Sequence, residues 1–241
     1  MKRILVWDIP IRIFHWLFAG SFLTAFAIAN LVDDDSSLFT VHMFLGGVIA
    51  FMVLLRLVWG VVGSKYARFS SFTFSPGAIL GYFKDAVTGG GDKYTGHNPG
   101  AALAHLAMFV LVLGLAFTGV FMSRAEIYEE IHEVLAWAMI VMVGAHVAGI
   151  IWHTIRHKEN IAASMVHGRK EGEPSQAIRS SRAALGVVFL VLTGLWGWGL
   201  YANYDAGQLN VPLTGQSITV GEGEEHDEHD EHDDEDEDYD D

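Results

Sequence analysis

Residues 132–146 read HEVLAWAMIVMVGAH, an apolar stretch with a histidine at each end. An α-helix turns through about 100° and rises about 1.5 Å per residue. The two histidines, His132 and His146, would therefore lie on nearly the same face of one helix, about 21 Å apart along its axis. Because the apolar core of a bilayer is about 30 Å thick, such a helix would place one histidine near each membrane surface. Ionisable side chains inside a membrane are rare and usually functional, so this stretch points to a membrane-embedded site.

Apolar segments recur along the chain, and the full set is Ile9–Leu31, Leu38–Gly63, Ala101–Met122, Val134–Trp152 and Ala183–Tyr201. Each has close to the ~20 residues that a helix needs to cross a bilayer. None shows the strict alternation of a barrel strand. The first segment is long for a signal peptide, contains Arg12 and His15, and has no clear cleavage site after it. The sequence therefore predicts an all-α integral membrane bundle of five transmembrane helices, with a short interfacial helix around residues 76–86.

The composition narrows the chemistry that such a bundle could carry. The 241 residues include no cysteine, which excludes disulfides, cysteine-ligated zinc, iron–sulfur clusters and covalently attached c-type haem. The 12 histidines remain as ligands for a metal or a cofactor. The net charge of -14 comes from the end of the chain, because residues 222–241 hold 15 of the 29 Asp and Glu and no Lys or Arg. The rest of the chain is nearly neutral, so it lacks the basic surface expected of a nucleic-acid-binding protein.

The distribution of basic residues predicts the orientation in the membrane. When the chain is threaded through five crossings, only Arg124 of the 15 Lys and Arg residues falls on the side opposite the N-terminus. Basic residues are enriched in cytoplasmic loops, so the N-terminus is expected in the cytoplasm. Five crossings then place the C-terminal tail in the periplasm.

Antiparallel helices bring two further histidines to the depths of His132 and His146. His15 lies near the cytoplasmic start of the first segment, and His42 near the outer start of the second. Two neutral imidazoles on opposite faces of an iron porphyrin make a six-coordinate site suited to electron transfer, and helical bundles hold such cofactors between their helices. The spacing thus predicts two b-type haems, one held by His15 and His146 and the other by His42 and His132. The small residues that would let a flat macrocycle approach the backbone are Gly46, Gly47, Gly114, Gly119, Gly144 and Gly149.

Four more side chains have alternative roles that the sequence leaves open. His153 lies seven residues after His146 on the same face, so it could replace His146 as a ligand or lie at the interface. His105 could contact a haem propionate or a quinone, or pack with a bond to a backbone carbonyl. Arg12 and Arg56 could pair with propionates or reach lipid phosphates. The membrane histidines as a set would also suit polar contacts between helices or a proton path.

Several motifs together resemble the bacterial cytochrome b561 and nickel-hydrogenase b-type cytochrome family. They are VWDIPIRIFHW at 6–16, HMFLG at 42–46, LRLVWG at 55–60, HNPG at 97–100, Thr118-Gly119, the pair His132 and His146, and MVHGRK at 165–170. Each motif alone is weak, but the combination is specific and covers about residues 2–170. The fifth apolar segment and the tail lie outside the four-helix pattern of the family.

The resemblance implies a protein of the bacterial inner membrane that carries b-type haem. Members pass electrons between the quinone pool and a partner, which here would be a periplasmic c-type cytochrome or a hydrogenase. The resemblance also assigns iron ligation to His15, His42, His132 and His146. His97 matches a family position, but it lies at a loop boundary and is not expected to be a ligand. Without nickel or iron–sulfur ligands of its own, the chain is expected to be an electron-transfer subunit, with or without its own quinone site.

Composition and resemblance divide the chain into four parts. We expect a cytochrome b domain over residues 1–170, a cytoplasmic linker over 171–182, a fifth transmembrane helix over 183–201 and a periplasmic tail over 202–241. The tail is acidic and His-rich from residue 222, and such a composition is expected to be disordered. It could be a solvated extension or a dock for a basic periplasmic cytochrome. It could also bind a divalent metal loosely through His226, His229 and His232.

Other functions compete with a partner-linked cytochrome. A stand-alone superoxide:quinone oxidoreductase of the same family would need no protein partner. A divalent metal transporter would use the membrane histidines and a metal-collecting tail without haem. The predicted spans contain no Asp or Glu, which argues against a transporter because cation carriers usually need such charge. A haem-free scaffold subunit would leave the matched depths of the histidines unexplained.

Overall fold

The computed structural model describes residues 2–33, 36–89, 93–205, 208–211 and 216–219. Its long helices are α1 (Ile9–Leu31), α2 (Phe39–Val62), α4 (Pro99–Phe121), α5 (Glu126–His157) and α7 (Ala183–Ala202). The shorter helical pieces are α3 (Pro76–Thr88), α6 (Ser164–His167) and the 3-10 turns η1 (Phe69–Ser71), η2 (Met122–Arg124) and η3 (Pro174–Gln176). β1 (Lys2–Leu5) pairs antiparallel with β2 (Arg169–Gly172). A second antiparallel sheet has the order β3 (Tyr204–Asp205), β4 (Gln208–Val211) and β5 (Gln216–Thr219).

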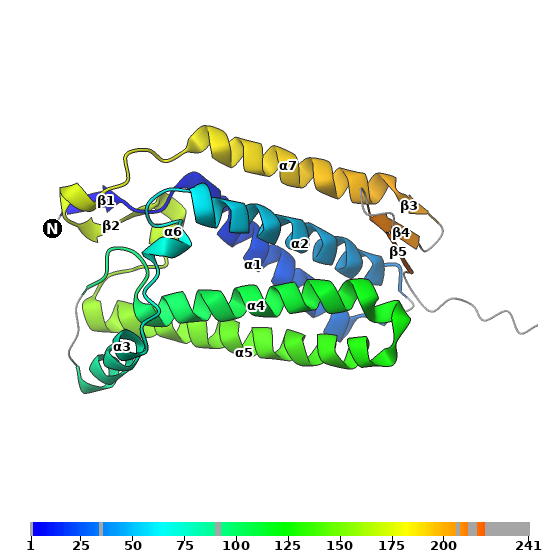
Figure 1. Ribbon diagram of the computed structural model, residues 1–241, viewed down its shortest axis with the longest axis horizontal. Coiled ribbons are helices and arrows are strands. Elements are labelled where there is room, and N and C mark those ends of the chain that lie inside the picture. Colours follow the sequence, from blue (N-terminus) through cyan, green and yellow to red (C-terminus); the bar gives the residue numbers. More distant parts are fainter. Residues whose placement is uncertain (1, 34–35, 90–92, 206–207, 212–215, 220–241) are drawn as a thin grey trace, which may run out of the picture.

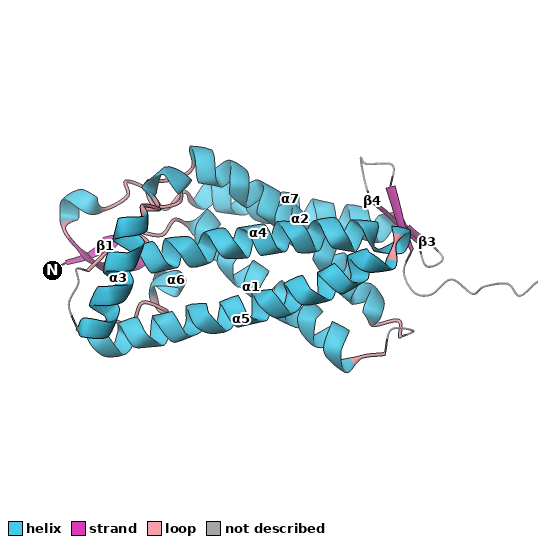
Figure 2. Ribbon diagram, turned by 60° about the horizontal axis from the view of Figure 1, so that its bottom comes forward, coloured by secondary structure: helices cyan, strands magenta, loops and turns pink. Residues whose placement is uncertain are grey.

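The long helices lie roughly side by side in an elongated bundle (Figure 1). α4 packs on α5, α1 packs on α2, and α7 packs on both α1 and α2. One end of the bundle carries β1, β2, α3 and α6 and is called the capped end below. The other carries β3, β4 and β5 and is called the hairpin end (Figure 2). Within the described chain, five helices are long and apolar enough to span a membrane, so the predicted all-α membrane bundle is confirmed.

A core of apolar side chains joins the helices near the middle of the bundle. Its buried members are Phe22, Ile49, Met52, Val53, Val112, Leu115, Met139 and Phe189. The outward faces of the same helices expose many large apolar side chains. Helices that are apolar all round are typical of membrane spans, whose outer surface contacts lipid instead of water.

The fifth long helix, α7, is an integral part of the bundle. A Cβ on Gly186 would lie only 2.4 Å from Ile9 Cγ2, so glycine is what allows α7 to approach α1. Trp196 donates from Nε1 to the carbonyl of Gly47 (3.1 Å) and stacks on Phe51, which fixes α7 to α2. The helix that lies outside the four-helix pattern therefore covers the α1–α2 side of the bundle.

The structure corrects one expectation about a boundary. The apolar segment predicted over Val134–Trp152 is part of a longer helix, because α5 already begins at Glu126. Glu126 and Glu129 lie in its first turn, where the positive end of the helix dipole favours carboxylates, so this polar segment extends the helix. The sequence does not predict the strands, because segments of two to four residues carry too little periodicity to be recognised.

Asp8 fixes the start of α1 at the capped end. The carboxylate is fully buried, and its Oδ1 accepts the backbone N–H of Ile11 (3.0 Å) as the N-cap. Its Oδ2 accepts the indole N–H of Trp59 on α2 (3.1 Å). One side chain therefore caps α1 and joins it to α2.

Replacing Asp8 by alanine should lower the free energy of unfolding by about 2–4 kcal/mol, because it removes a helix cap and leaves a partly buried indole N–H unpaired. Thermal denaturation of the purified protein in detergent would measure the loss. Asn98→Ala is the matched control, since Asn98 caps α4 through Ala101 N–H (2.7 Å) and should cost only about 1 kcal/mol. Equal losses in the two variants would show that the bond to Trp59 contributes nothing.

Candidate functional site

His42 and His132 face each other at the hairpin end. His42 lies in the first turn of α2 and His132 in the second turn of α5. Their ring centroids are 6.2 Å apart, and the ring planes meet at 67°. The sequence pairs these two histidines by their depth in the membrane, and the structure places them side by side.

Hydrogen bonds fix both imidazoles through the same ring nitrogen. His42 Nδ1 donates to the carbonyl of Ala25 on α1 (2.9 Å). His132 Nδ1 lies 3.0 Å from Thr118 Oγ1, whose own hydroxyl donates to the carbonyl of Gly114. Both partners therefore act as acceptors, so Nδ1 carries the proton in each ring. Nε2 keeps its lone pair, and outer hydrogen bonds of this kind are what orient metal-ligating histidines.

The spacing of these two rings fits an iron between them. With metal–nitrogen bonds of about 2 Å, imidazoles on opposite sides of a metal have centroids about 6 Å apart. A Cβ on Gly46, one turn beyond His42, would meet no atom within 4 Å. A Cβ on Gly119 would make an ordinary contact with the His132 ring, at 3.4 Å. The donor set and the small residues beside it therefore fit a haem with two axial histidines.

Four histidines gather at the capped end. His105 on α4 and His146 on α5 have ring centroids 5.4 Å apart, and His97, just before α4, lies 4.8 Å from His105. His15 on α1 interacts electrostatically with both His146 and His105. The predicted partners His15 and His146 thus both lie in this cluster, and His105 lies beside them.

The hydrogen bonds at this end differ from those of the first pair. His105 Nδ1 donates to the carbonyl of Ala101, one turn earlier on α4. Packing with a bond to a backbone carbonyl is one of the two roles that the sequence leaves open for His105. His15 Nδ1 is buried and has no hydrogen-bond partner among the described residues. His15 therefore lacks the orienting bond that His42 and His132 both have.

His97, expected at a loop boundary, packs against two aromatic rings. Its ring contacts Trp7 (4.8 Å) and Phe72 (4.6 Å), and its buried Nδ1 has no partner within the described chain. Burial, followed by the neighbouring His105, holds the pKa of His97 well below its ordinary value of 6.5, so the ring is neutral at pH 7. The sequence feature that indicates the position of His97 is Asn98. Because Asn98 caps α4, it fixes where His97, the residue before it, enters the bundle.

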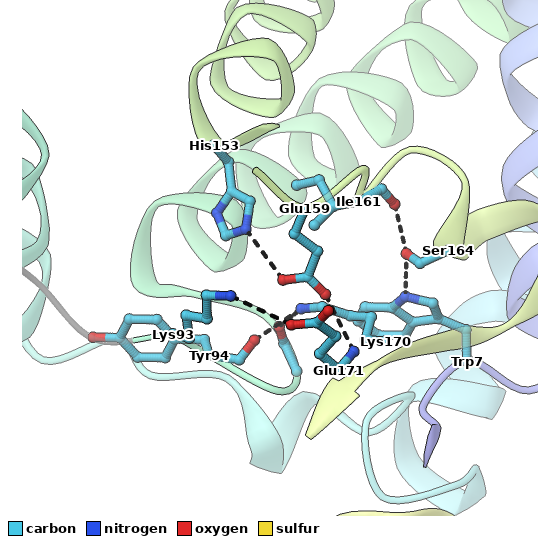
Figure 3. A network of polar contacts seen from close by, with 10 residues as sticks. Trp7, Lys93, Tyr94, His153, Glu159, Ile161, Ser164, Lys170 and Glu171 are labelled. Carbon is cyan, nitrogen blue, oxygen red and sulfur yellow. Dashed lines mark hydrogen bonds and ion pairs between the residues drawn. The ribbon is translucent and has the colours of Figure 1, made fainter. Parts of the chain in front are cut away.

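His153 belongs to a polar network of the capped end (Figure 3). Its Nε2 lies 3.9 Å from Oε2 of Glu159, and Oε1 of the same carboxylate accepts the backbone N–H of Glu171 (3.2 Å). Next to it, the amine of Lys170 donates to the carbonyl of Tyr94 (2.8 Å). Burial lowers the pKa of Lys170 from its ordinary value. His153 is thus engaged by the segment that follows α5.

The two arginines also lie at the capped end. Arg12 donates to the carbonyl of Val166, and its buried Nε has no partner in the described part of the chain. Arg56 donates through Nη2 to the carbonyl of Ala67 (3.0 Å) and is buried inside the bundle.

The structure describes no residue of the acidic tail from residue 222. The predicted metal ligands of the tail, His226, His229 and His232, therefore lie outside the described residues, and so does the predicted disorder of the tail. Within the described ranges, no three His, Cys, Asp or Glu side chains converge as a metal ion would require.

A model of the prokaryotic cytochrome b561 family matches residues 6–168. A relative from Rhizobium leguminosarum bv. viciae, named a probable Ni/Fe-hydrogenase B-type cytochrome subunit, is 23% identical over 214 residues, covering 70% of this chain and 89% of the relative. A relative of the same name from Bradyrhizobium diazoefficiens is 23% identical over 215 residues, covering 69% of this chain and 85% of the relative. No solved structure matches the chain.

The family match covers most of the chain and contains both histidine pairs. The resemblance found from the sequence motifs is therefore confirmed. The chain belongs to the prokaryotic cytochrome b561 family, whose members are multi-pass membrane proteins that carry b-type haem and transport electrons.

Proposed function

We propose that this protein is a dihaem cytochrome that moves electrons across the bacterial inner membrane between the quinone pool and a redox partner on the periplasmic side. His42 and His132 would hold one haem at the hairpin end, and His15 and His146 would hold the other at the capped end. Haem b with two axial histidines supplies one-electron transfer and leaves no open position for oxygen chemistry.

The facing pair His42 and His132 is the observation that carries the proposal. A polar contact between helices needs only one nitrogen of each ring, and the Nδ1 bonds already provide it. Here each Nδ1 bonds a separate acceptor on a separate helix, and no bond joins the two rings. This arrangement supports two Nε2 atoms held for a shared ligand.

The capped end supplies the second site. His146 lies about 21 Å from His132 along α5, which supports two separate sites near opposite membrane surfaces. His15 comes from α1 and His146 from α5, so the two approach from different helices. His105 packs against His146 and limits how the His146 ring can turn.

The charge distribution supports an orientation with the capped end in the cytoplasm. Lys2 in β1 and Lys170 in β2 lie at the capped end, whereas Arg124 in η2 lies at the hairpin end. A hydrogenase is the favoured partner, because both relatives are named for one. A periplasmic c-type cytochrome is the second candidate, because the acidic residues 222–241 would attract a basic surface.

The quinone role can be tested on the purified protein in detergent. Addition of duroquinol should convert the oxidised haem spectrum to the reduced one, because a quinol with access to a haem site donates its electrons there. The dimethyl ether of duroquinol, which cannot be oxidised to the quinone because both oxygens are methylated, is the control, and dithionite defines full reduction. Reduction by dithionite with no change on adding duroquinol would contradict the quinone role and leave the haem assignment intact.

A further inference from the structure

Arg56 carries a positive charge into the interior of the bundle. It lies on α2 near the capped end and is only 5% exposed. Among the described residues, the carboxylates within 4.0 Å of a basic side chain are Glu171, beside Lys93, and Glu159, beside His153, so Arg56 has no carboxylate within that distance. A buried charge without a close counterion is strongly destabilising unless another group compensates it.

The protein satisfies only part of the guanidinium. Its Nη2 donates to the carbonyl of Ala67, and its plane lies over the rings of Phe69 (5.1 Å) and Phe109 (5.5 Å). Its Nη1 is buried and has no hydrogen-bond partner among the residues that the structure describes. Arginine presents its donors as a planar fork that matches a carboxylate, so half of this fork is left without an acceptor.

Asp8 does not complete the site. It is the acid that acts electrostatically on Arg56, but it forms no ion pair with it. Both of its carboxylate oxygens are already used, one by the backbone of Ile11 and the other by Trp59. Asp8 therefore reduces the cost of burying the charge without filling the free side of the fork.

The free side of the guanidinium belongs to the same region as the capped-end histidines. Arg56 interacts electrostatically with His97 and His105. Phe69, which lies under the guanidinium, contacts Phe72, and Phe72 contacts His97. His97 Nδ1 is one of several buried nitrogens of the capped end, besides Arg56 Nη1, that have no partner in the described chain. The free nitrogens of Arg56 and His97 therefore lie beside the proposed capped-end haem site.

We propose that Arg56, assisted by His97, binds an oxyanion of the cofactor held at the capped end. The ligand is an anionic oxygen, supplied by a haem propionate or by the deprotonated ring oxygen of a reduced quinone. Arg56 would be a binding residue that also sets the redox potential of the nearby haem, because a fixed positive charge favours the reduced iron. The inference rests on the proposed haem at the capped end.

The test compares Arg56→Gln with Arg56→Lys by redox titration of the purified protein. In Arg56→Gln, the ratio of oxidised to reduced haem at a fixed potential should rise at least tenfold for one of the two haems, a shift of about 59 mV for a one-electron couple. Arg56→Lys keeps the charge and should shift the ratio much less. Arg68→Gln removes an exposed charge from the same end and is the matched control. Infrared difference spectra on protein with ¹³C-labelled propionates should lose a redox-linked carboxylate band in Arg56→Gln.

The arms of this experiment separate the sources of the oxyanion. A shift that persists after quinone removal, with the carboxylate band changed, identifies a propionate. A shift that appears only when quinone is added identifies a quinone oxygen. Unchanged titrations in both preparations, with the usual haem content, would overturn the role of Arg56 and leave the proposed function standing. A purified chain without haem would overturn both.

Discussion

Replacing His132 by alanine should remove one haem and leave about one per chain instead of about two. His132 and His42 provide the two Nε2 atoms of the hairpin-end site, and an iron held from one side only is bound far more weakly. His42→Ala should have the same effect, because the two rings act as one site. The haem content is measured by pyridine haemochrome assay against protein concentration.

Glu133→Ala is the control for the loss of haem at the hairpin end. Glu133 is the exposed neighbour of His132 on α5, so its replacement changes the same turn of helix without touching the pair. It should retain about two haems per chain. Full haem content in both His132→Ala and His42→Ala would show that the facing pair is a structural contact between helices.

The hairpin-end pair was predictable from the sequence for a specific physical reason. A transmembrane helix has a fixed rise and turn, so the depth and face of His132 follow from its position in an apolar run. The antiparallel return of α2 then sets the depth of His42. The acceptors that hold both rings, Ala25 and the hydroxyl of Thr118, were not predictable, because they depend on how α1 and α4 pack against the pair.

At the capped end, helical spacing does not predict which side chains are in contact. Depth alone puts His15 level with His146, but it does not reveal that His105 lies against His146. The entry of His97 depends on how the segment before α4 folds back over Phe72, which no helical spacing encodes. The burial of Arg56 without a close counterion is likewise a tertiary property, because a basic residue near the end of a span more often reaches toward lipid phosphates.

Replacing His146 by alanine should remove the capped-end haem, whereas His153→Ala should retain both haems. Both residues lie on one face of α5, so the sequence could not choose between them. In the structure, His153 faces Glu159 and contacts His157, within the network of the capped end (Figure 3). His146 instead lies in the histidine cluster with His15. The loss is measured as a drop to about one haem per chain, with the remaining haem assigned by its redox titration.

The double variant His132→Ala/His146→Ala gives the sharpest form of this prediction. One histidine is removed from each pair, so the chain should be purified without haem, while each single variant keeps the haem of the other site. His105→Ala tests the neighbour that touches His146 and should keep both haems, because the proposed ligands His15 and His146 both remain. Loss of haem in His105→Ala but not in His15→Ala would reassign the second axial ligand from α1 to α4. The two sites would then still lie at opposite ends of α5, but the capped-end haem would lie between α4 and α5, farther from α1.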